Sequence, residues 1–151
     1  MSENNPYRIF VAHNWQKDDD YLRVFEYLEA TDKFFYINLS DPEKIPDDVS
    51  KEGLKAALRD QAKDAEVVLL LSSLVRDHYD MAHYQVTMAK AAHIPIVGLR
   101  PWGSEEVSDE LKACADAVAG WNAIEIVDAV KRAGRGEDAN RWEVIEFDPN
   151  L

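Results

Sequence analysis

VVLLL, residues 67–71, decides the fold class, because it is apolar at every position. A strand with one solvated face alternates apolar and polar residues, whereas a strand of a parallel sheet is buried on both faces and forms a continuous apolar run. PIVGL, residues 95–99, is a second run of this kind. The two segments predict the centre of a parallel sheet that helices cover on both sides.

Shorter β-type segments and helical patterns alternate around these two runs. Strands are predicted at 8–12 and 34–39, with a fifth around 120–121, and helices at 18–30, 54–62, 78–92, 107–118 and from 122. This alternation predicts a single α/β domain, residues 8–133, with a flavodoxin-like doubly wound parallel sheet. A C-terminal extension, residues 134–151, contains WEVIEF, which is one possible edge strand.

Loops at the carboxyl ends of the predicted strands are the expected ligand site. Doubly wound sheets bind ligands at this edge, near the point where the strand order reverses. The loops concerned are 13–17, 38–48, 72–79 and 100–106.

Composition limits the classes of binding partner and the cellular compartment that we expect. The net charge of −12 is spread over 151 residues, which argues against a nucleic-acid interface and against docking on anionic membranes. A local pocket can still oppose this sign and bind a small anion. The one cysteine, Cys114, excludes a disulfide framework, and no signal-peptide pattern or membrane-spanning apolar run is found, so we expect a cytoplasmic protein.

Several site chemistries of this fold are disfavoured by absent motifs. The first loop, HNWQKDDD, has no glycine, so a G-x-G-x-x-G dinucleotide fingerprint is missing, and no P-loop is found. The third strand ends in Ser72-Ser73 and not in the aspartate of a phospho-accepting domain. No metal site is expected, because His78, Asp80 and His83 suit solvated positions near a helix start.

The helix MAHYQVTMAK, residues 81–90, has an amide on its apolar face. Met81, Gln85 and Met88 share one side of the helix. A buried primary amide that lacks partners costs about 1–3 kcal/mol. From position alone, Gln85 is either a satisfied structural amide or a ligand contact. Likewise, Trp15, Trp102 and Trp121 either pack the rim of the core or offer stacking surfaces for a planar ligand.

Four segments, in this order, resemble TIR-like domains of the Thoeris antiphage systems over about residues 8–132. They are RIFVAHNW with DDDY, LKAALRDQAKDAEVVLLLSS, MAHYQVTMAKAAHIPIVGLRPWG and DAVAGWNAIEIVDAVK. The resemblance implies a flavodoxin-like TIR fold and an intracellular enzyme that consumes NAD as a substrate, with no permanently bound cofactor. Such enzymes cleave the nicotinamide–ribose bond and make an ADP-ribose-derived messenger, either cyclic or joined to a free amino acid such as histidine. The messenger activates a separate effector protein, and self-association is expected.

The resemblance also implies site residues. The family's catalytic glutamate follows an aromatic residue in a pattern like Tyr-Glu-Ile, and this chain has Gln85 in the corresponding sequence Tyr84-Gln85-Val86. Met81 stands where the family often has tryptophan. The nucleotide-binding residues implied beside position 85 are His13, Asn14, Trp15, Asn38, Leu39 and Tyr84.

Gln85 keeps the length of glutamate but lacks its charge. Cleavage of an N-glycosidic bond passes through an oxocarbenium-like state that a carboxylate stabilises, so this chain is expected to be inactive as it stands. The charge was either lost naturally or removed by an engineered isosteric substitution. We favour the second, because the surrounding sequence keeps the family's pattern. The alternative function is a non-catalytic TIR-like module that binds a nucleotide or a protein partner.

Overall fold

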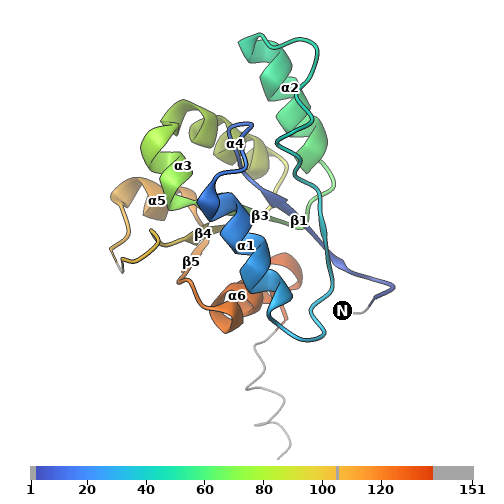
Figure 1. Ribbon diagram of the computed structural model, residues 1–151, viewed down its shortest axis with the longest axis vertical. Coiled ribbons are helices and arrows are strands. Elements are labelled where there is room, and N and C mark those ends of the chain that lie inside the picture. The colour runs from blue at the N-terminus through green and yellow to red at the C-terminus, as the bar shows by residue number, and fades with distance from the viewer. Residues whose placement is uncertain (1–2, 105, 138–151) are drawn as a thin grey trace, which may run out of the picture.

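A five-stranded, all-parallel sheet forms the centre of the computed structural model, which describes residues 3–104 and 106–137 (Figure 1). The strands are β1 Tyr7–Val11, β2 Tyr36–Asn38, β3 Val67–Leu71, β4 Ile96–Leu99 and β5 Ala117–Ala119. Their order across the sheet is β2-β1-β3-β4-β5. The predicted flavodoxin-like, doubly wound arrangement is therefore confirmed.

Helices cover both faces of this sheet (Figure 1). They are α1 Asp19–Glu29, α2 Lys51–Ala62, α3 Ser72–Asp77, α4 Tyr79–Ala91, α5 Asp109–Cys114 and α6 Ala123–Arg135. α1 packs against α6 on one face, and α2 packs against α4 on the other, as right-handed crossovers require. Side chains that accept from first-turn N–H groups fix four of the helix starts: Asp18, Ser50, Ser108 and Asn122.

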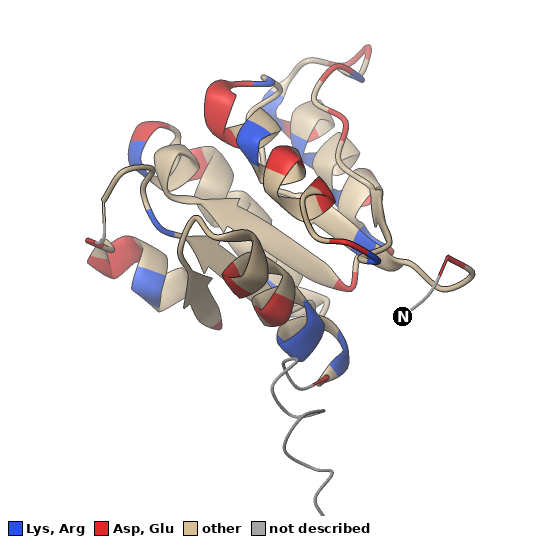
Figure 2. Ribbon diagram, turned by 60° about the horizontal axis from the view of Figure 1, so that its bottom comes forward, with Lys and Arg blue, Asp and Glu red and all other residues tan. Residues whose placement is uncertain are grey.

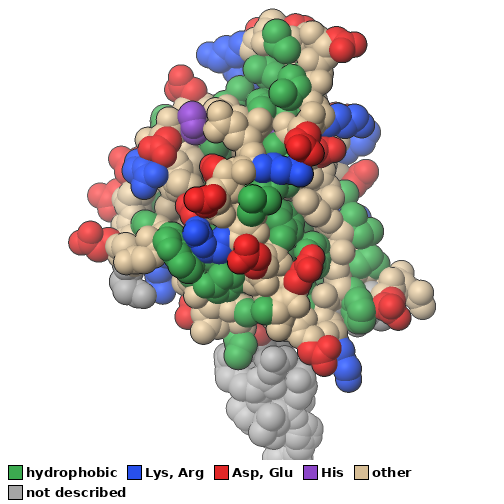
Figure 3. All heavy atoms as spheres, in the orientation of Figure 1, with side chains coloured by type: hydrophobic (Ala, Val, Ile, Leu, Met, Phe, Trp, Pro, Cys, Tyr) green, Lys and Arg blue, Asp and Glu red, His purple; other side chains and the backbone are tan. Residues whose placement is uncertain are grey.

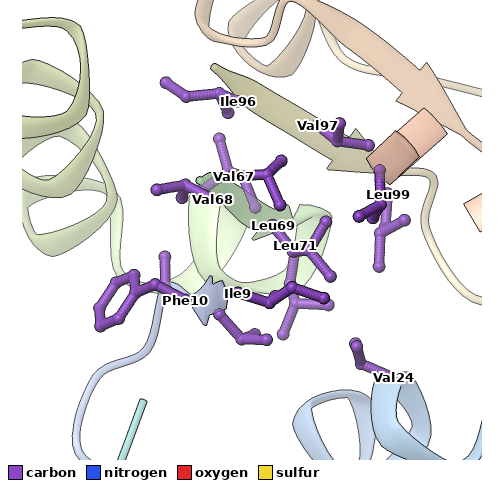
Figure 4. Close-up of a cluster of buried hydrophobic side chains, with 14 of the residues drawn as sticks. Ile9, Phe10, Val24, Val67, Val68, Leu69, Leu71, Ile96, Val97 and Leu99 are labelled. Carbon is purple, nitrogen blue, oxygen red and sulfur yellow. The ribbon is translucent and has the colours of Figure 1, made fainter. Parts of the chain in front are cut away.

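The core lies on the three central strands (Figure 4). All five residues of β3 and all four of β4 are buried, which confirms the expectation from VVLLL and PIVGL. Side chains such as Ile9, Leu69 and Ile96 are fully excluded from solvent. Burial of a side chain of this size contributes about 1.5–3 kcal/mol, so each of these strand residues stabilises the fold.

Three predicted segments were wrong in their boundaries. Residues 72–79, expected to be a loop, contain the short helix α3. The helix expected over 107–118 ends at Cys114, and β5 starts at Ala117, before the predicted position around 120–121. The run Ala115-Asp116-Ala117 has no strand signal, and two hydrogen bonds between Asp116 and the backbone of Ile96 align it with β4 instead (2.7 and 2.8 Å).

The last helix that the structure describes, α6, starts where the sequence predicts, just after Asn122. The side chain of Asn122 caps it, and Glu125 in its first turn accepts from Gly120 N–H (2.9 Å). WEVIEF lies outside the described residues. Within residues 3–104 and 106–137, no helix is long and apolar enough to cross a membrane.

We predict that Gly98→Ala in β4 destabilises the fold. A Cβ at this position would lie 3.0 Å from Leu111 Cδ1 and 3.2 Å from Ala115 Cβ, so α5 would have to move. The expected loss in the free energy of unfolding is about 1–3 kcal/mol, measured by urea unfolding. Leu111→Ala opens space for the new methyl group, so the double variant should lose less than the sum of the single variants. Additive losses would contradict this explanation.

Candidate functional site

Gln85 lies at the carboxyl edge of the sheet, on α4, and is fully buried. Its Oε1 accepts from His13 N–H (3.1 Å), and its Nε2 donates to His13 C=O (2.9 Å) and to Met81 C=O (3.0 Å). The partners fix the amide's orientation, because a backbone N–H only donates and a carbonyl only accepts. In this structure the amide is therefore satisfied by the protein itself.

His13 is the residue that Gln85 holds, and it lies just beyond β1 with 3% of its surface exposed. Its ring Nδ1 accepts from Trp15 N–H (3.0 Å), and its Nε2 lies 3.0 Å from Gln61 Oε1 on α2. Burial lowers the pKa of His13, against the opposite effects of the Gln61 hydrogen bond and the Asp41 carboxylate. The ring is consequently neutral at pH 7.

Asn14 and Trp15 continue the same loop. Asn14 Nδ2 lies 3.1 Å from His78 Nδ1, which joins the loop to the start of α4. Trp15 adopts a left-handed backbone conformation, with φ of 61°, and its ring meets the His13 ring edge-on with centroids 4.9 Å apart. The structure thus brings His13, Asn14, Trp15 and Gln85 together.

Asn38 and Leu39 lie at the end of β2, on the other side of β1. Asn38 Nδ2 donates to the hydroxyl of Tyr21 (3.3 Å), whose ring lies 6.4 Å from that of His13. Leu39 N–H donates to Ile9 C=O (2.8 Å), so its backbone extends the pairing of β2 with β1. Their hydrogen bonds go to Tyr21, Ser40 and Ile9 rather than to Gln85.

Tyr84, the neighbour of Gln85, points to α2. Its hydroxyl accepts from Arg59 Nη1 (3.0 Å) and donates to Lys55 C=O (3.2 Å), while Lys55 Nζ lies 5.0 Å from the ring centroid. A groove of about 390 Å³ lies between the two helices here. Its lining residues are Lys51, Lys55, Tyr79, Asp80, His83, Tyr84 and Thr87.

A row of cations follows this side of α2, the helix that projects at the top of Figure 1. Lys51, Lys55 and Arg59 are spaced four residues apart, so they lie along one side of the helix. In the part of the chain that the structure describes, none of them forms an ion pair, whereas Lys63 at the end of the same helix pairs with Asp60. Figure 2 shows basic segments on α2 within a generally acidic molecule. This row is positive locally, although the whole chain is strongly negative.

Trp102 and Trp121 belong to another cluster. Their rings meet edge-on at 5.6 Å, Arg23 lies 4.0 Å over the Trp102 ring, and Trp121 Nε1 donates to Arg100 C=O (2.7 Å). Both rings also meet Tyr27 on α1. The residues that contact Trp102 and Trp121 lie on α1 and after β4. Of the three candidate tryptophans, it is therefore Trp15 that contacts the His13 site. The face of the molecule in Figure 3 mixes apolar and charged side chains.

The polar residues at the start of α4 have protein partners. His83 packs against Tyr79 with ring centroids 5.8 Å apart, and His78 contacts Asn14. In residues 3–104 and 106–137, no three His, Cys, Asp or Glu side chains are grouped so that they could hold a metal ion. Cys114 is half-buried against the core.

Sequence reasoning missed Gln61 and Asp41. Gln61 Oε1 also accepts from Asp41 N–H (3.0 Å), and its Nε2 donates to Asp41 C=O (3.0 Å). Gln61 occupies a polar position on a surface helix, so its residue type and spacing give no signal. Only the approach of α2 to the ends of β1 and β2 reveals its role.

The strand order β2-β1-β3-β4-β5 defines a flavodoxin-like α/β domain, an arrangement that is consistent with TIR-like domains. A sequence model of the family described as Thoeris protein ThsB, TIR-like domain, matches residues 10–106. That match spans more than half of the chain and includes position 85, so the chain belongs to this family. No curated protein sequence matches the chain.

We predict that Gln85→Glu makes stability depend on pH. A carboxylate would keep the bond from His13 N–H, but its second oxygen would face the carbonyls of His13 and Met81, so the folded-state pKa of the introduced carboxyl group should rise. At about pH 4, below the unfolded pKa of about 4.3, the acid form can donate to one carbonyl and the penalty is small. As the pH rises toward 7, the free energy of unfolding should fall by about 1–3 kcal/mol relative to the parent chain.

Urea unfolding of both chains at pH 4, 5.5 and 7 measures this difference. Gln16→Glu is the control, because Gln16 is exposed on the neighbouring loop. If the difference in free energy of unfolding between Gln85→Glu and the parent chain did not vary with pH, the introduced carboxylate would not lie against the carbonyls of His13 and Met81.

Proposed function

We propose that this chain is the NAD-processing TIR domain of a cytoplasmic antiphage system, held inactive by the amide at position 85. The active form would cleave the nicotinamide–ribose bond of NAD. It would pass the ADP-ribosyl group to an internal hydroxyl, giving a cyclic product, or to a free amino acid. The product would act as a diffusible messenger for a separate effector protein. Family membership and the location of position 85 at the switch point support this proposal.

The missing carboxylate explains the proposed inactivity in electrostatic terms. Departure of nicotinamide leaves positive charge on the ribose, and a group placed for that charge contributes about 10²–10³ in rate. A neutral amide still offers an oxygen and an NH₂ group to ribose hydroxyls, but it offers no counter-charge. The substrate could therefore bind without rapid turnover.

The match to the ThsB TIR-like family carries this proposal, and the hydrogen bonds of Gln85 indicate how a carboxylate would behave at position 85. A glutamate there would lose both bonds that Nε2 donates, to His13 and to Met81. One of its oxygens would then be repelled by two carbonyls in a buried site. A carboxylate in that position is stabilised by an approaching cation, and both nicotinamide in NAD and the ribosyl intermediate carry positive charge.

The groove between α2 and α4 supports a nucleotide as the ligand. Lys51 and Lys55 line this groove together with Asp80, and Arg59 lies beside it through its bond to Tyr84; the three cations form no ion pair among the described residues and would offer positive charge to a pyrophosphate. Tyr84 connects this groove to position 85, because it contacts Lys55 and Arg59 and precedes Gln85 in the chain. We propose that the phosphates lie along this row. We further propose that the chain self-associates, since the resemblance implies sites shared between subunits.

Gln85→Glu is predicted to release nicotinamide from NAD at least 10²-fold faster than the parent chain, because it restores the counter-charge. Mass spectrometry of the nucleotide products, with and without free amino acids, measures the release and identifies the acceptor. Gln16→Glu adds the same charge on the neighbouring loop and should stay inactive. An engineered origin of Gln85 predicts recovery by this one change, whereas natural loss predicts that further changes are needed. A folded Gln85→Glu chain that stays inert under infection-like conditions would count against the enzyme.

A non-catalytic binding module is the second candidate, and the complete hydrogen bonding of Gln85 favours it. Millimolar NAD separates the two candidates without catalysis. A ligand that binds only the folded state raises the melting temperature, by about 2–4 °C for each kcal/mol in a domain of this size. The nucleotide-site proposal predicts such a rise.

In this melting experiment, Lys55→Glu should remove most of the rise, because it reverses a charge inside the groove. Lys112→Glu on α5 makes the same charge change elsewhere and should keep the rise. No rise for the parent chain would favour a protein-interaction module.

A further inference from the structure

The loops after β1 and β2 are held by two glutamine side chains in the same manner. Gln85 pairs with both the N–H and the C=O of His13. Gln61 pairs with both the N–H and the C=O of Asp41. His13 and Asp41 lie beyond the ends of their strands, where no strand of the described structure pairs with their backbone. In each case the glutamine side chain accepts from the backbone N–H and donates to the backbone C=O, as a strand would.

The ring of His13 joins these two attachments. Trp15 N–H can only donate, so His13 Nδ1 must accept, and the ring proton must lie on Nε2. Nε2–H then donates to Gln61 Oε1, which also accepts from Asp41 N–H. A continuous chain of hydrogen bonds therefore runs from Trp15 N–H through the His13 ring and Gln61 to Asp41, and it requires one neutral tautomer of His13.

Trp15 is the strained member of this group. Its positive φ of 61° is uncommon for a bulky residue and costs on the order of 1–3 kcal/mol. The bond from its N–H to His13 Nδ1 holds the backbone in this conformation. Its indole Nε1 is buried and has no hydrogen-bond partner in the described structure. Such a conformation persists only where its surroundings enforce it, and here the enforcing group is the His13 ring.

We infer that Gln61 is a positioning residue: through the neutral His13 ring it holds Trp15 in its left-handed conformation and ties it to Asp41. The loops that follow β1 and β2 thereby keep one shared geometry at the candidate site. Gln61 would act on the nucleotide only through His13 and Trp15. The part of this inference that concerns nucleotide affinity rests on the proposed function, whereas the part that concerns His13 and Trp15 does not.

NMR of the full ¹⁵N-labelled chain tests the inference without a ligand. In the parent chain, the His13 ring should give one protonated and one unprotonated nitrogen signal. Gln61→Leu removes the acceptor, so these signals should average between tautomers, and amide exchange at Trp15 should rise at least tenfold. Gln16→Leu, on the exposed part of the same loop, should change neither signal. A folded Gln61→Leu chain with unchanged His13 and Trp15 signals would overturn the inference.

Gln61→Glu is a second variant that keeps an oxygen for His13 Nε2–H. The single tautomer and the slow exchange at Trp15 should be retained, and the pKa of His13 should rise because a carboxylate now faces Nε2. The other titratable groups that face His13, Asp41 and Tyr21, are unchanged in this variant. An unaltered His13 pKa would mean that residue 61 does not contact the ring in solution, and the inference would fail.

Nucleotide affinity supplies the functional readout. If Gln61→Leu lowers the population of the competent loop geometry to about a tenth, the apparent Kd for NAD should rise about tenfold, and Gln61→Glu should restore much of it. Unchanged affinity in Gln61→Leu, with NAD still bound, would overturn the positioning role. If the parent chain does not bind NAD but the Gln61 variants still show the expected NMR changes, the proposed function is rejected. The inference about His13 and Trp15 is then supported.

Discussion

The paired hydrogen bonds between the Gln85 amide and the backbone of His13 fix the carboxyl end of β1 against α4. β1 lies between β2 and β3, and Ala12 N–H still finds Leu69 C=O of β3. His13 is the next residue, and without Gln85 its buried N–H and C=O would have no strand to pair with. A buried N–H or C=O without a partner costs about 1–3 kcal/mol. The Gln85 amide therefore stabilises the backbone at the point where the chain passes from β1 into the His13 loop. The His13 ring, the Trp15 conformation and the contact with Gln61 all depend on it.

The same bonds link stability to the activity that we propose for position 85. An amide suits surroundings that offer one donor and two acceptors, whereas a carboxylate suits only the donor. Glutamate at this position would destabilise the protein without a ligand. A cation bound beside it would stabilise its carboxylate. Active sites commonly carry such costs, since the groups needed for chemistry are not those that best satisfy the fold. Replacement of the carboxylate by an amide removes both the cost and the proposed chemistry.

The local charge of α2 favours an anionic ligand, whereas the total charge of the chain disfavours one. The chain carries −12, yet three cations without an ion-pair partner among the described residues lie in a row on α2, beside Tyr84. At physiological ionic strength, screening limits exposed charges to a range of about 8 Å, so a ligand in the groove responds to this row more than to distant carboxylates. An overall acidic protein can thus offer a site for a pyrophosphate while it repels long polyanions.

The amino-acid sequence by itself determined the sheet class, and it singled out position 85 as a candidate. Continuous apolar runs at VVLLL and PIVGL required a doubly covered parallel sheet, and the family pattern around Tyr84 marked Gln85. The sequence did not reveal α3, whose six residues are too few for a helical period, or the start of β5, whose alanines favour a helix. Only the tertiary structure decided that Gln85 pairs with His13 and that Gln61 joins His13 to Asp41. These contacts join residues from separate elements, and an amide's partners depend on which backbone groups the sheet leaves unpaired, a property that no local spacing encodes.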